Sequence, residues 1–355
     1  MKQGADNWQV YHIVQPYFFA HHHFHKRKVD VLRKNGIDAK ILSFIPRKLY
    51  QENIERYDSF KNNGAIELVK GGRPFFAMSL IVFLLIKILS GKKILVHVLR
   101  TSPMAIIFLR YLPFVKSRLR YIQEFEGDNA SEFLYAKEYR EYPRPPEKAN
   151  TVVTKLKYLI LLKLQRYQVN NADGLILMSQ EHVDLWESRL NRSLCASILP
   201  TLADPGRVWF DPDTRKKLRE ELGLMGKVVL TYSGNVICKW QRREAMCRFV
   251  AELSKKQPQI SFLALVRRDD ITLMRSSLKN HGIEPITILK TIEQQDMYKY
   301  LSAADIALFL RHNHTMNNIV TSGKLGEYLA AGLPVITTGC NAKVLNDFIF
   351  NMIIN

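Results

Sequence analysis

Short apolar runs alternate with longer amphipathic segments along most of the chain. Runs such as 94–99 and Ile260–Val266 are apolar at nearly every position, which is typical of parallel strands buried on both faces. The segments between them repeat apolar residues every three or four positions and predict helices. This alternation predicts an α/β protein with doubly wound parallel sheets. The expected strands are 8–15, 37–44, 66–69, 94–99, 119–125, 174–178, 228–232, 260–266, 286–289, 306–310 and 334–337.

The length and the turn residues together predict two domains. A chain of 355 residues is long for a single core. Pro200 and the run Asp204-Pro205-Gly206 interrupt the alternation after the sixth expected strand. We therefore expect an N-terminal domain over residues 1–203 and a C-terminal domain over residues 204–355.

Two segments allow either core packing or membrane contact. The apolar run 75–86 is shorter than the roughly 20 residues that span a bilayer, so we expect a buried helix, with an interfacial helix as the alternative. The basic helix expected over 152–170 places Leu156, Leu159, Ile160 and Leu164 on one side, and core packing is again favoured over membrane contact. The N-terminus does not have the pattern of a signal peptide, and the four cysteines are scattered, so we expect a cytoplasmic protein.

Positive charge is concentrated in the first part of the chain. Residues 1–200 contain 31 Lys and Arg against 18 Asp and Glu, so they carry +13 of the total charge of +19. Such a field attracts anionic partners. The sequence shows neither a helix-turn-helix nor a zinc-finger pattern, so we expect no nucleic acid partner and favour the surface of an anionic membrane.

The segment from Asp305 to Thr338 combines a strand, a polar loop, a helix and a second strand. The loop after a parallel strand meets the amino end of the next helix, where free N–H groups and the helix dipole favour a phosphate. Thr321, Ser322 and Gly323 form this helix start, and Lys324 adds a positive charge. Glu327, one turn later, is suited to a ribose diol. A simpler interpretation makes Ser322 only an N-cap and Gly332 only a C-terminal glycine.

The same segment resembles the nucleotide-sugar signature of the retaining glycosyltransferases of family 4, which have the GT-B fold. The matching run is Lys324-Leu325-x-Glu327-Tyr328-Leu329-Ala330-x-Gly332-x-Pro334-Val335-Ile336. The resemblance implies two Rossmann-like domains facing across a cleft, with the nucleotide sugar bound by the second. It also implies retention of anomeric configuration without a metal or other cofactor, with Lys239 and Glu327 as the central residues.

Further residues are assigned by position and by this resemblance. The turn after the strand 228–232 contains Ser233, Gly234 and Asn235, followed by Lys239-Trp240, and looks like the donor loop of the family. Arg267 ends the next strand, where relatives contact the base. Arg100, Glu126 and Asp128 follow two N-terminal strands and are the candidate acceptor-side group, although Arg100 could be a lone surface arginine and Asp128 a helix cap.

The sequence departs from the family pattern at two places. Family members have a first glutamate eight positions before the one matched by Glu327, and Ile319 occupies that position here. Asn317 or Asn318 is the candidate replacement as a sugar contact. The chain also ends soon after Thr338, where relatives continue with a long helix, so we expect a truncated C-terminal domain.

The sequence thus predicts a glycosyltransferase that moves a sugar from a nucleotide diphosphate to a polysaccharide or lipid-linked acceptor, on the inner face of the cell membrane. Two alternatives stay open: a GT-B sugar-nucleotide epimerase, and a non-catalytic basic protein that binds anionic lipid or nucleic acid. Two weaker metal candidates are the pair His21 and His25, one turn apart, and the Asp211-Pro212-Asp213 run.

Overall fold

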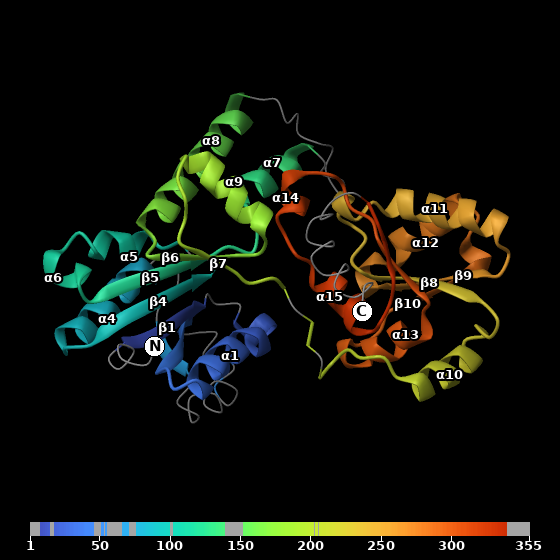
Figure 1. Cartoon of the computed structure of the whole chain (residues 1–355), viewed down its shortest axis with the longest axis horizontal. Helices are drawn as coiled ribbons and strands as arrows, with labels where there is room; N and C mark the ends of the chain where they lie inside the picture. Colours follow the sequence, from blue (N-terminus) through green and yellow to red (C-terminus); the bar gives the residue numbers. More distant parts are fainter. Residues whose placement is uncertain are drawn as a thin grey trace. The chain divides into compact units, whose positions relative to one another are not determined.

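The computed structural model describes residues 8–14, 18–45, 51–52, 54, 66–70, 76–99, 102–138, 152–201, 203–204 and 206–338. The chain divides into two compact units (Figure 1). Unit 1 comprises Met1–Glu126, Ile160–Leu177 and Val183–Ile198, and unit 2 comprises Gly127–Leu159, Met178–His182 and Leu199–Asn355. Unit 2 thus includes two short segments that precede the expected boundary in sequence.

Each unit is built on one parallel sheet. Among the described residues, the sheet of unit 1 has the strand order β3-β2-β1-β4-β5-β6-β7, and that of unit 2 the order β10-β9-β8-β11-β12. The strands are β1 (Trp8–Val14), β2 (Ala39–Ile45), β3 (Ile66–Lys70), β4 (Lys93–Leu99), β5 (Leu119–Glu124), β6 (Gly174–Leu177), β7 (Ala196–Ile198), β8 (Val228–Gly234), β9 (Ile260–Val266), β10 (Thr287–Lys290), β11 (Ile306–Phe309) and β12 (Val335–Thr337).

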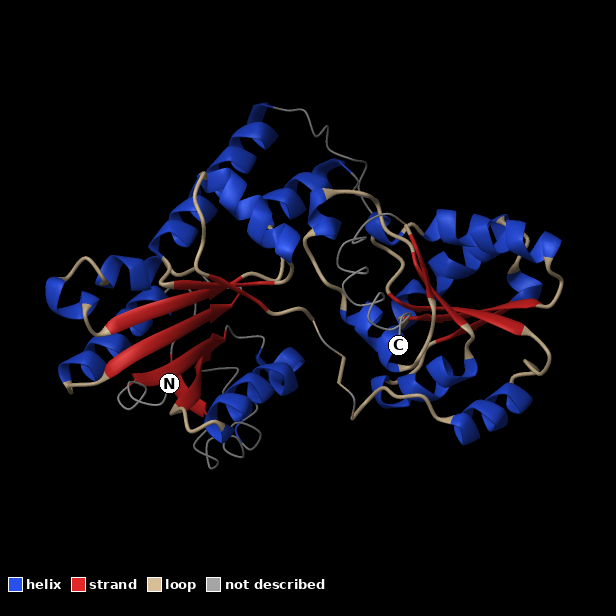
Figure 2. Cartoon of the chain, viewed as in Figure 1, coloured by secondary structure: helices blue, strands red, loops and turns tan. Residues whose placement is uncertain are grey.

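Helices cover both faces of each sheet (Figure 2). In the N-terminal part these are α1 (Phe18–Lys34), α4 (Phe76–Leu89), α5 (Met104–Leu109), α6 (Pro113–Lys116), α7 (Asn129–Glu138), α8 (Val152–Asn171) and α9 (Gln180–Leu190). The later helices are α10 (Pro212–Glu221), α11 (Arg243–Lys256), α12 (Ile271–Asn280), α13 (Met297–Ala303), α14 (Thr315–Asn318) and α15 (Gly323–Ala330). The doubly wound parallel sheets predicted from the alternation are therefore confirmed.

The two faces of the first sheet bury different side chains. Tyr11 and Ile13 of β1 pack with α4 and α5, whereas Val10 and Val14 pack with Val29 of α1. This alternation follows from the two-residue period of a strand. The second sheet behaves in the same way: Tyr232 of β8 packs with α11 and α12, whereas Val229 of the same strand packs on the other face with α13 and α15. Each strand is therefore held from both sides.

The expectation that α8 packs its leucines into a core is wrong. Leu156 and Leu159 are 56% and 58% exposed, and Ile160 and Leu164 are also exposed. The helix buries a different side, which carries Thr154, Gln165 and Val169. The prediction of a buried helix holds for only one side of α4. Leu80, Leu84 and Ile88 are buried, but Met78, Val82, Ile86 and Leu89 lie at the surface. Apolar periodicity alone does not tell which stripe of a nearly all-apolar helix faces the sheet.

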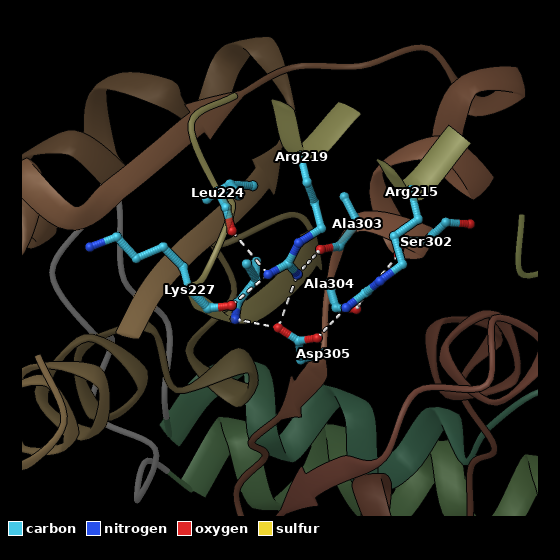
Figure 3. A network of polar contacts seen from close by, with 9 residues as sticks. Arg215, Arg219, Leu224, Lys227, Ser302, Ala303, Ala304 and Asp305 are labelled. Carbon is cyan, nitrogen blue, oxygen red and sulfur yellow. Dashed lines mark hydrogen bonds and ion pairs between the residues drawn. The ribbon is translucent and has the colours of Figure 1, made fainter. Parts of the chain in front are cut away.

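An arginine network ties α10 to the sheet of unit 2 (Figure 3). Arg219 is buried and donates to the carbonyl oxygens of Ala303, Leu224 and Lys227 and to the Asp305 carboxylate. The other oxygen of Asp305 pairs with Arg215, and the Val229 N–H also donates to this carboxylate. These bonds connect the start of β8, the loop before β11 and α10. The network satisfies polar groups that burial would otherwise leave unpaired.

Candidate donor site in unit 2

The site forms at the carboxyl ends of β8 and β11. These two strands are neighbours in the sheet, but the chain leaves β8 toward β9 on one side and leaves β11 toward β12 on the other. Ligands of open parallel sheets bind at such a switch in strand order, because the loops diverge there and leave space. Gly234 ends β8, and Arg311 follows β11 by two residues. The helix α15 begins at Gly323 and brings Lys324 to the same place.

Lys324 crosses directly over Gly234. A Cβ atom at Gly234 would lie 1.9 Å from Lys324 Cε and 2.4 Å from Lys324 Nζ, so a larger residue would displace the lysine. The φ angle of Gly234 is 134°, a conformation that favours glycine. Two regions about 90 positions apart in sequence, the donor loop and the predicted phosphate-binding helix, are therefore in contact. The sequence expectation that both contribute to one site is consistent with this contact.

Lys324 lies in a cluster of positive charges. Burial lowers the pKa of Lys324, and the charges of Arg311 and Arg267 lower it further, whereas the Glu327 carboxylate opposes the shift. Burial raises the pKa of Glu327, and Lys324 opposes that shift. Arg311, Arg267 and Glu327 therefore all act on the charge of Lys324. Two guanidinium groups beside a partly buried ammonium group favour an anion such as a diphosphate at this place.

Ser322 occupies the N-cap position of α15 but does not cap it with its side chain. Its hydroxyl accepts a hydrogen bond from Arg311 Nη2 at 3.1 Å. Ser322 is therefore the N-cap residue by position, as the simpler interpretation expects, but its side chain bonds to Arg311 and not to the helix. The arrangement joins Arg311 to the amino end of α15, whose first-turn N–H groups favour an anion. Gly332 has the positive φ angle expected of a C-terminal glycine, 70°.

Ser233, the residue before Gly234, and Tyr328 connect β8 to α15. The Tyr328 hydroxyl accepts hydrogen bonds from the Ser233 backbone N–H at 2.8 Å and from the Ser233 hydroxyl at 3.2 Å. Tyr328 is fully buried, and burial raises its pKa to about 12. Ser233, a predicted donor contact, thus holds α15 against β8. Its neighbour Asn235 has a buried side-chain oxygen without a hydrogen-bond partner among the described residues.

Lys239 begins a short 3₁₀ helix, Lys239–Gln241, beside an aromatic cluster of unit 2. The charge of Lys239 contributes, after burial and Arg242, to lowering the pKa of His312. Trp240 lies edge-on to Tyr135, with ring centroids 5.9 Å apart, and His314 lies 5.0 Å from the same tyrosine ring. Lys239 is therefore near the loop between β11 and α14, as well as on the donor loop.

The loop before α15 contains Ile319, the position at which the sequence departs from the family 4 pattern. Ile319 is buried, so the position of the first family glutamate is part of the core. The buried Asn317 donates to the His312 carbonyl oxygen at 2.8 Å, and its own side-chain oxygen lacks a partner among the described residues. The Thr321 hydroxyl accepts a hydrogen bond from the Thr201 N–H at 2.7 Å, so this predicted donor contact also fixes the preceding segment of unit 2.

The predicted acceptor-side residues are only partly described. Arg100 lies outside the described residues. Glu126 is partly buried just after β5. Asp128 is fully buried and accepts hydrogen bonds from the N–H and the hydroxyl of Ser131, so it caps α7. Asp211 is likewise a cap, accepting from the N–H groups of Asp213 and Thr214 at the start of α10.

Two residues of the site were not identified from the sequence. Arg311 was not singled out, although a charged residue directly after a buried strand was a usable signal. Tyr328 was quoted only as part of a resemblance. Its contact with Ser233 bridges 95 positions in sequence, and no local pattern reports such a contact.

Comparisons with known proteins find solved glycosyltransferase structures with a similar fold. No protein-family model matches the sequence, and no curated protein is significantly similar to it. Solved structures do match. HepE of Anabaena, in complex with UDP, is 11% identical with a TM-score of 0.62, over 95% of this chain and 82% of that one.

Two further structures support the same fold. WaaG, a glycosyltransferase of lipopolysaccharide biosynthesis, is 12% identical with a TM-score of 0.58, over 95% of this chain and 84% of that one. The pneumococcal O-GlcNAc transferase GtfA, in complex with UDP and GlcNAc, is 11% identical with a TM-score of 0.58, over 94% and 84%. The chain has the GT-B fold of these glycosyltransferases, as the sequence predicted.

Proposed function

We propose that the protein is a glycosyltransferase that takes a sugar from a nucleotide diphosphate bound in unit 2. The observation that carries this proposal is the position of Lys324, which crosses Gly234 at the switch point of the sheet with Arg311 and Arg267 nearby. A nucleotide diphosphate is an anion that these positive charges attract. Nearby, the partly buried carboxylate of Glu327 can accept hydrogen bonds from a ribose diol.

The chemistry follows from charge. When the bond between the sugar and the diphosphate breaks, negative charge grows on the leaving phosphate, and preorganised cations stabilise it. Lys324, Arg311, Lys239 and the amino end of α15 are the groups proposed for this role, without a metal cofactor. Retention of configuration is supported by the resemblance of the run from Lys324 to Ile336 to the family 4 signature.

The proposed donor base is uracil, and the proposed acceptor is a glycan or a lipid-linked glycan. Support for the base is that HepE and GtfA were both solved with UDP. Support for the acceptor class is the similarity in fold to WaaG, which acts in lipopolysaccharide biosynthesis. The epimerase and the non-catalytic alternatives have no comparable support from this geometry.

UDP is expected to stabilise the chain in a thermal-shift measurement, and Glu327→Ala is expected to abolish most of the shift. A ligand at a concentration of 100 times its Kd stabilises the folded state by about 2.7 kcal/mol. For a domain of this size, this raises the melting temperature by several degrees. The Glu327→Ala variant loses the proposed contact with the ribose and therefore binds UDP more weakly. GDP and CMP in parallel samples test the choice of base.

A matched control is Glu252→Ala, because Glu252 lies at the surface of α11 and pairs only locally with Lys255. This variant should keep the full shift. If UDP, GDP and CMP all leave the melting temperature of the wild-type chain unchanged, the proposed donor site is wrong. Turnover of a UDP-sugar to another UDP-sugar without any acceptor would instead favour the epimerase.

We further propose that unit 1 contacts an anionic membrane through α4, α5 and α6. No described helix is long and apolar enough to span a bilayer. The exposed side of α4 is apolar, however, and Phe108, Tyr111 and Phe114 are exposed on the segment that follows β4. The sequence from Phe76 to Arg120 contains basic residues but no Asp or Glu. Apolar side chains with surrounding lysines favour the interface of an anionic bilayer.

The double variant Ile86→Glu/Phe108→Glu is expected to reduce binding to vesicles of phosphatidylglycerol by at least about tenfold. Each insertion of a large apolar side chain contributes about 1.5–3 kcal/mol, and the new carboxylates are repelled by the lipid. Co-sedimentation measures the bound fraction. Val31→Glu, at an exposed position of α1, is the control and should bind normally. Equal binding of the double variant and the wild type would refute this surface.

A further inference from the structure

The carboxyl ends of β11 and β12 are joined by threonine side chains beyond their last backbone pair. Phe309 ends β11 and is paired in register with Thr337 of β12, whose hydroxyl donates to the Phe309 carbonyl oxygen at 2.9 Å. Arg311 lies two residues further along the chain. The Thr338 hydroxyl accepts a hydrogen bond from the Arg311 N–H at 2.9 Å and donates to the Arg311 carbonyl oxygen at 2.6 Å. One hydroxyl group therefore engages both backbone groups of Arg311.

A threonine is well suited to this double contact. Its hydroxyl has one proton to donate and lone pairs to accept, so a single oxygen can serve an N–H and a carbonyl group together. Because Thr338 is branched at Cβ, its side chain has few rotamers and the hydroxyl has a defined position. Arg311 is only 8% exposed, and buried backbone groups need partners. The position of the Arg311 backbone therefore depends on the Thr338 hydroxyl.

The side chain of Arg311 is held at its tip by two further residues. Arg311 Nη2 donates to the Ser322 hydroxyl at 3.1 Å, and the guanidinium carbon lies 4.6 Å from the centre of the Phe309 ring. A guanidinium group over the face of a ring is attracted by the negative charge of the π system. With its backbone fixed at one end and its tip at the other, the arginine has few alternative orientations.

The charge of Arg311 acts on both the loop after β8 and α15. Burial lowers the pKa of Lys324, and the charge of Arg311 contributes to that shift. Burial raises the pKa of Tyr328 to about 12 and also raises the pKa of Cys238, and in both cases Arg311 opposes the shift. Lys324 and Tyr328 belong to α15, and Cys238 follows β8. The guanidinium group is therefore close to both elements that form the candidate donor site.

An arginine fixed in this way is suited to a phosphate group. The planar guanidinium presents its N–H groups as a fork that matches phosphate oxygens. Donors that are already oriented stabilise a developing negative charge without having to reorganise during the reaction. A displacement of about 1 Å at such a group can lower the rate by about 100-fold. A residue that sets the backbone of Arg311 can therefore affect the reaction without touching the substrate.

We propose that Thr338 is a positioning residue, whose hydroxyl fixes the backbone of Arg311 so that the guanidinium group contacts a phosphate oxygen of the nucleotide diphosphate. The phosphate contact rests on the proposed donor site. The placement of Arg311 by Thr338 does not, because it follows from contacts within unit 2 alone. The edge strand β12 thus acts on the site through the residue that follows it.

The placement is tested without any ligand, by ¹H–¹⁵N NMR of the arginine Nε–H groups in the full chain labelled with ¹⁵N-arginine. The variant Arg311→Lys assigns the signal. We expect Thr338→Val to shift the Arg311 signal and Thr338→Ser, which keeps the hydroxyl, to restore it. Thr338→Ala is a second variant without the hydroxyl and without added bulk, and should act like valine. An Arg311 signal that is the same in both hydroxyl-free variants and in the wild type would overturn the placement.

The matched control is Thr287→Val. The Thr287 hydroxyl donates to the Ile283 carbonyl oxygen at 2.7 Å, at the amino end of β10, so this variant also removes one threonine hydroxyl bond from the sheet of unit 2. The amino ends of parallel strands lie at the edge of the sheet opposite the candidate donor site. The Arg311 signal and the rate of sugar transfer should both equal those of the wild type.

The phosphate contact is tested by adding UDP or inorganic pyrophosphate to the wild-type chain. We expect the Arg311 Nε–H signal to shift with each of them, because both supply a diphosphate. In steady-state assays with a UDP-sugar, Thr338→Val should lower kcat by about tenfold or more, with a smaller change in KM, and Thr338→Ser should recover most of the rate. A merely structural role would lower the melting temperature and leave kcat unchanged, which would overturn the proposal.

The double variant Arg311→Met/Thr338→Val tests whether Thr338 acts through Arg311. It should be no slower than Arg311→Met alone, since the guanidinium that Thr338 positions is already absent. A further loss of about tenfold would overturn the positioning role. If UDP raises the melting temperature while the Arg311 signal ignores both UDP and pyrophosphate, the phosphate contact is wrong and the donor site stands. If no nucleotide raises the melting temperature and pyrophosphate leaves the Arg311 signal unchanged, the donor site and the phosphate contact are both wrong.

Discussion

Replacing Lys324 with methionine is expected to lower the rate of sugar transfer by about 10²–10³-fold, the usual cost of removing one preorganised group that stabilises charge in a transition state. Methionine keeps the length and the apolar stem of lysine, so the side chain can still cross Gly234. Only the positive charge is lost. Steady-state release of UDP from a UDP-sugar, with a membrane-derived glycan as acceptor, measures the rate.

The control for this prediction is Lys279→Met, which removes a positive charge from the surface of α12. It should leave the rate unchanged. A second comparison is Gly234→Ala, whose Cβ atom would meet Lys324 Cε and displace the lysine without removing its charge. Its activity should fall toward that of the lysine variant. If Lys324→Met retains most of the wild-type rate, the cluster around this lysine does not hold the leaving diphosphate.

Replacing Arg219 with leucine is expected to lower the free energy of unfolding of unit 2 by about 3 kcal/mol. Removal of one partner from a buried ion pair leaves the other groups unsatisfied, which typically costs 3–5 kcal/mol, and the partial exposure of Asp305 reduces this figure. Three carbonyl oxygens would also lose their donor (Figure 3). Urea denaturation followed by tryptophan fluorescence measures the change.

Arg215→Leu is the matched control, because Arg215 pairs with the same carboxylate but is more exposed. Its effect should be clearly smaller. Burial alone would raise the pKa of Asp305, but the bonds from Val229, Arg215 and Arg219 outweigh it and lower its pKa in the folded state. This contribution to stability is therefore present above the unfolded pKa of about 3.9 and is lost as the pH falls through the lower, folded value. Equal stability of both variants would contradict the central role given to Arg219.

The apolar pattern was enough to locate the parallel sheets. Strands such as β9 are buried on both faces, and their continuous apolar runs distinguish them from the amphipathic helices that follow. The loop after β8 and the start of α15 could also be named as candidates, because glycines, a lysine and a glutamate at strand ends have recognisable local chemistry. Their shared location follows from the rule that parallel strands end at the same edge.

The pattern could not determine which surfaces are buried. The apolar side of α8 that carries Leu156 lies at the surface, whereas Gln165 is buried, because the orientation of a helix depends on the partners it finds. The same limit applies to His12 and His97, two buried histidines of unit 1 that lie side by side. In the sequence, His12 and His97 are isolated residues in apolar strands, 85 positions apart. Only the register of β1 with β4 makes them neighbours.

The sequence by itself indicated most strands and helices in their order, without β7, together with the positions where loops meet helix starts and the residue types able to bind a phosphate. These properties are local, since they depend on side chains a few positions apart. The tertiary structure alone decided that Lys324 crosses Gly234, that Arg311 reaches Ser322, and that His12 lies beside His97. Each of these contacts joins elements whose proximity is set by sheet register and helix packing, and neither leaves a signal within one segment.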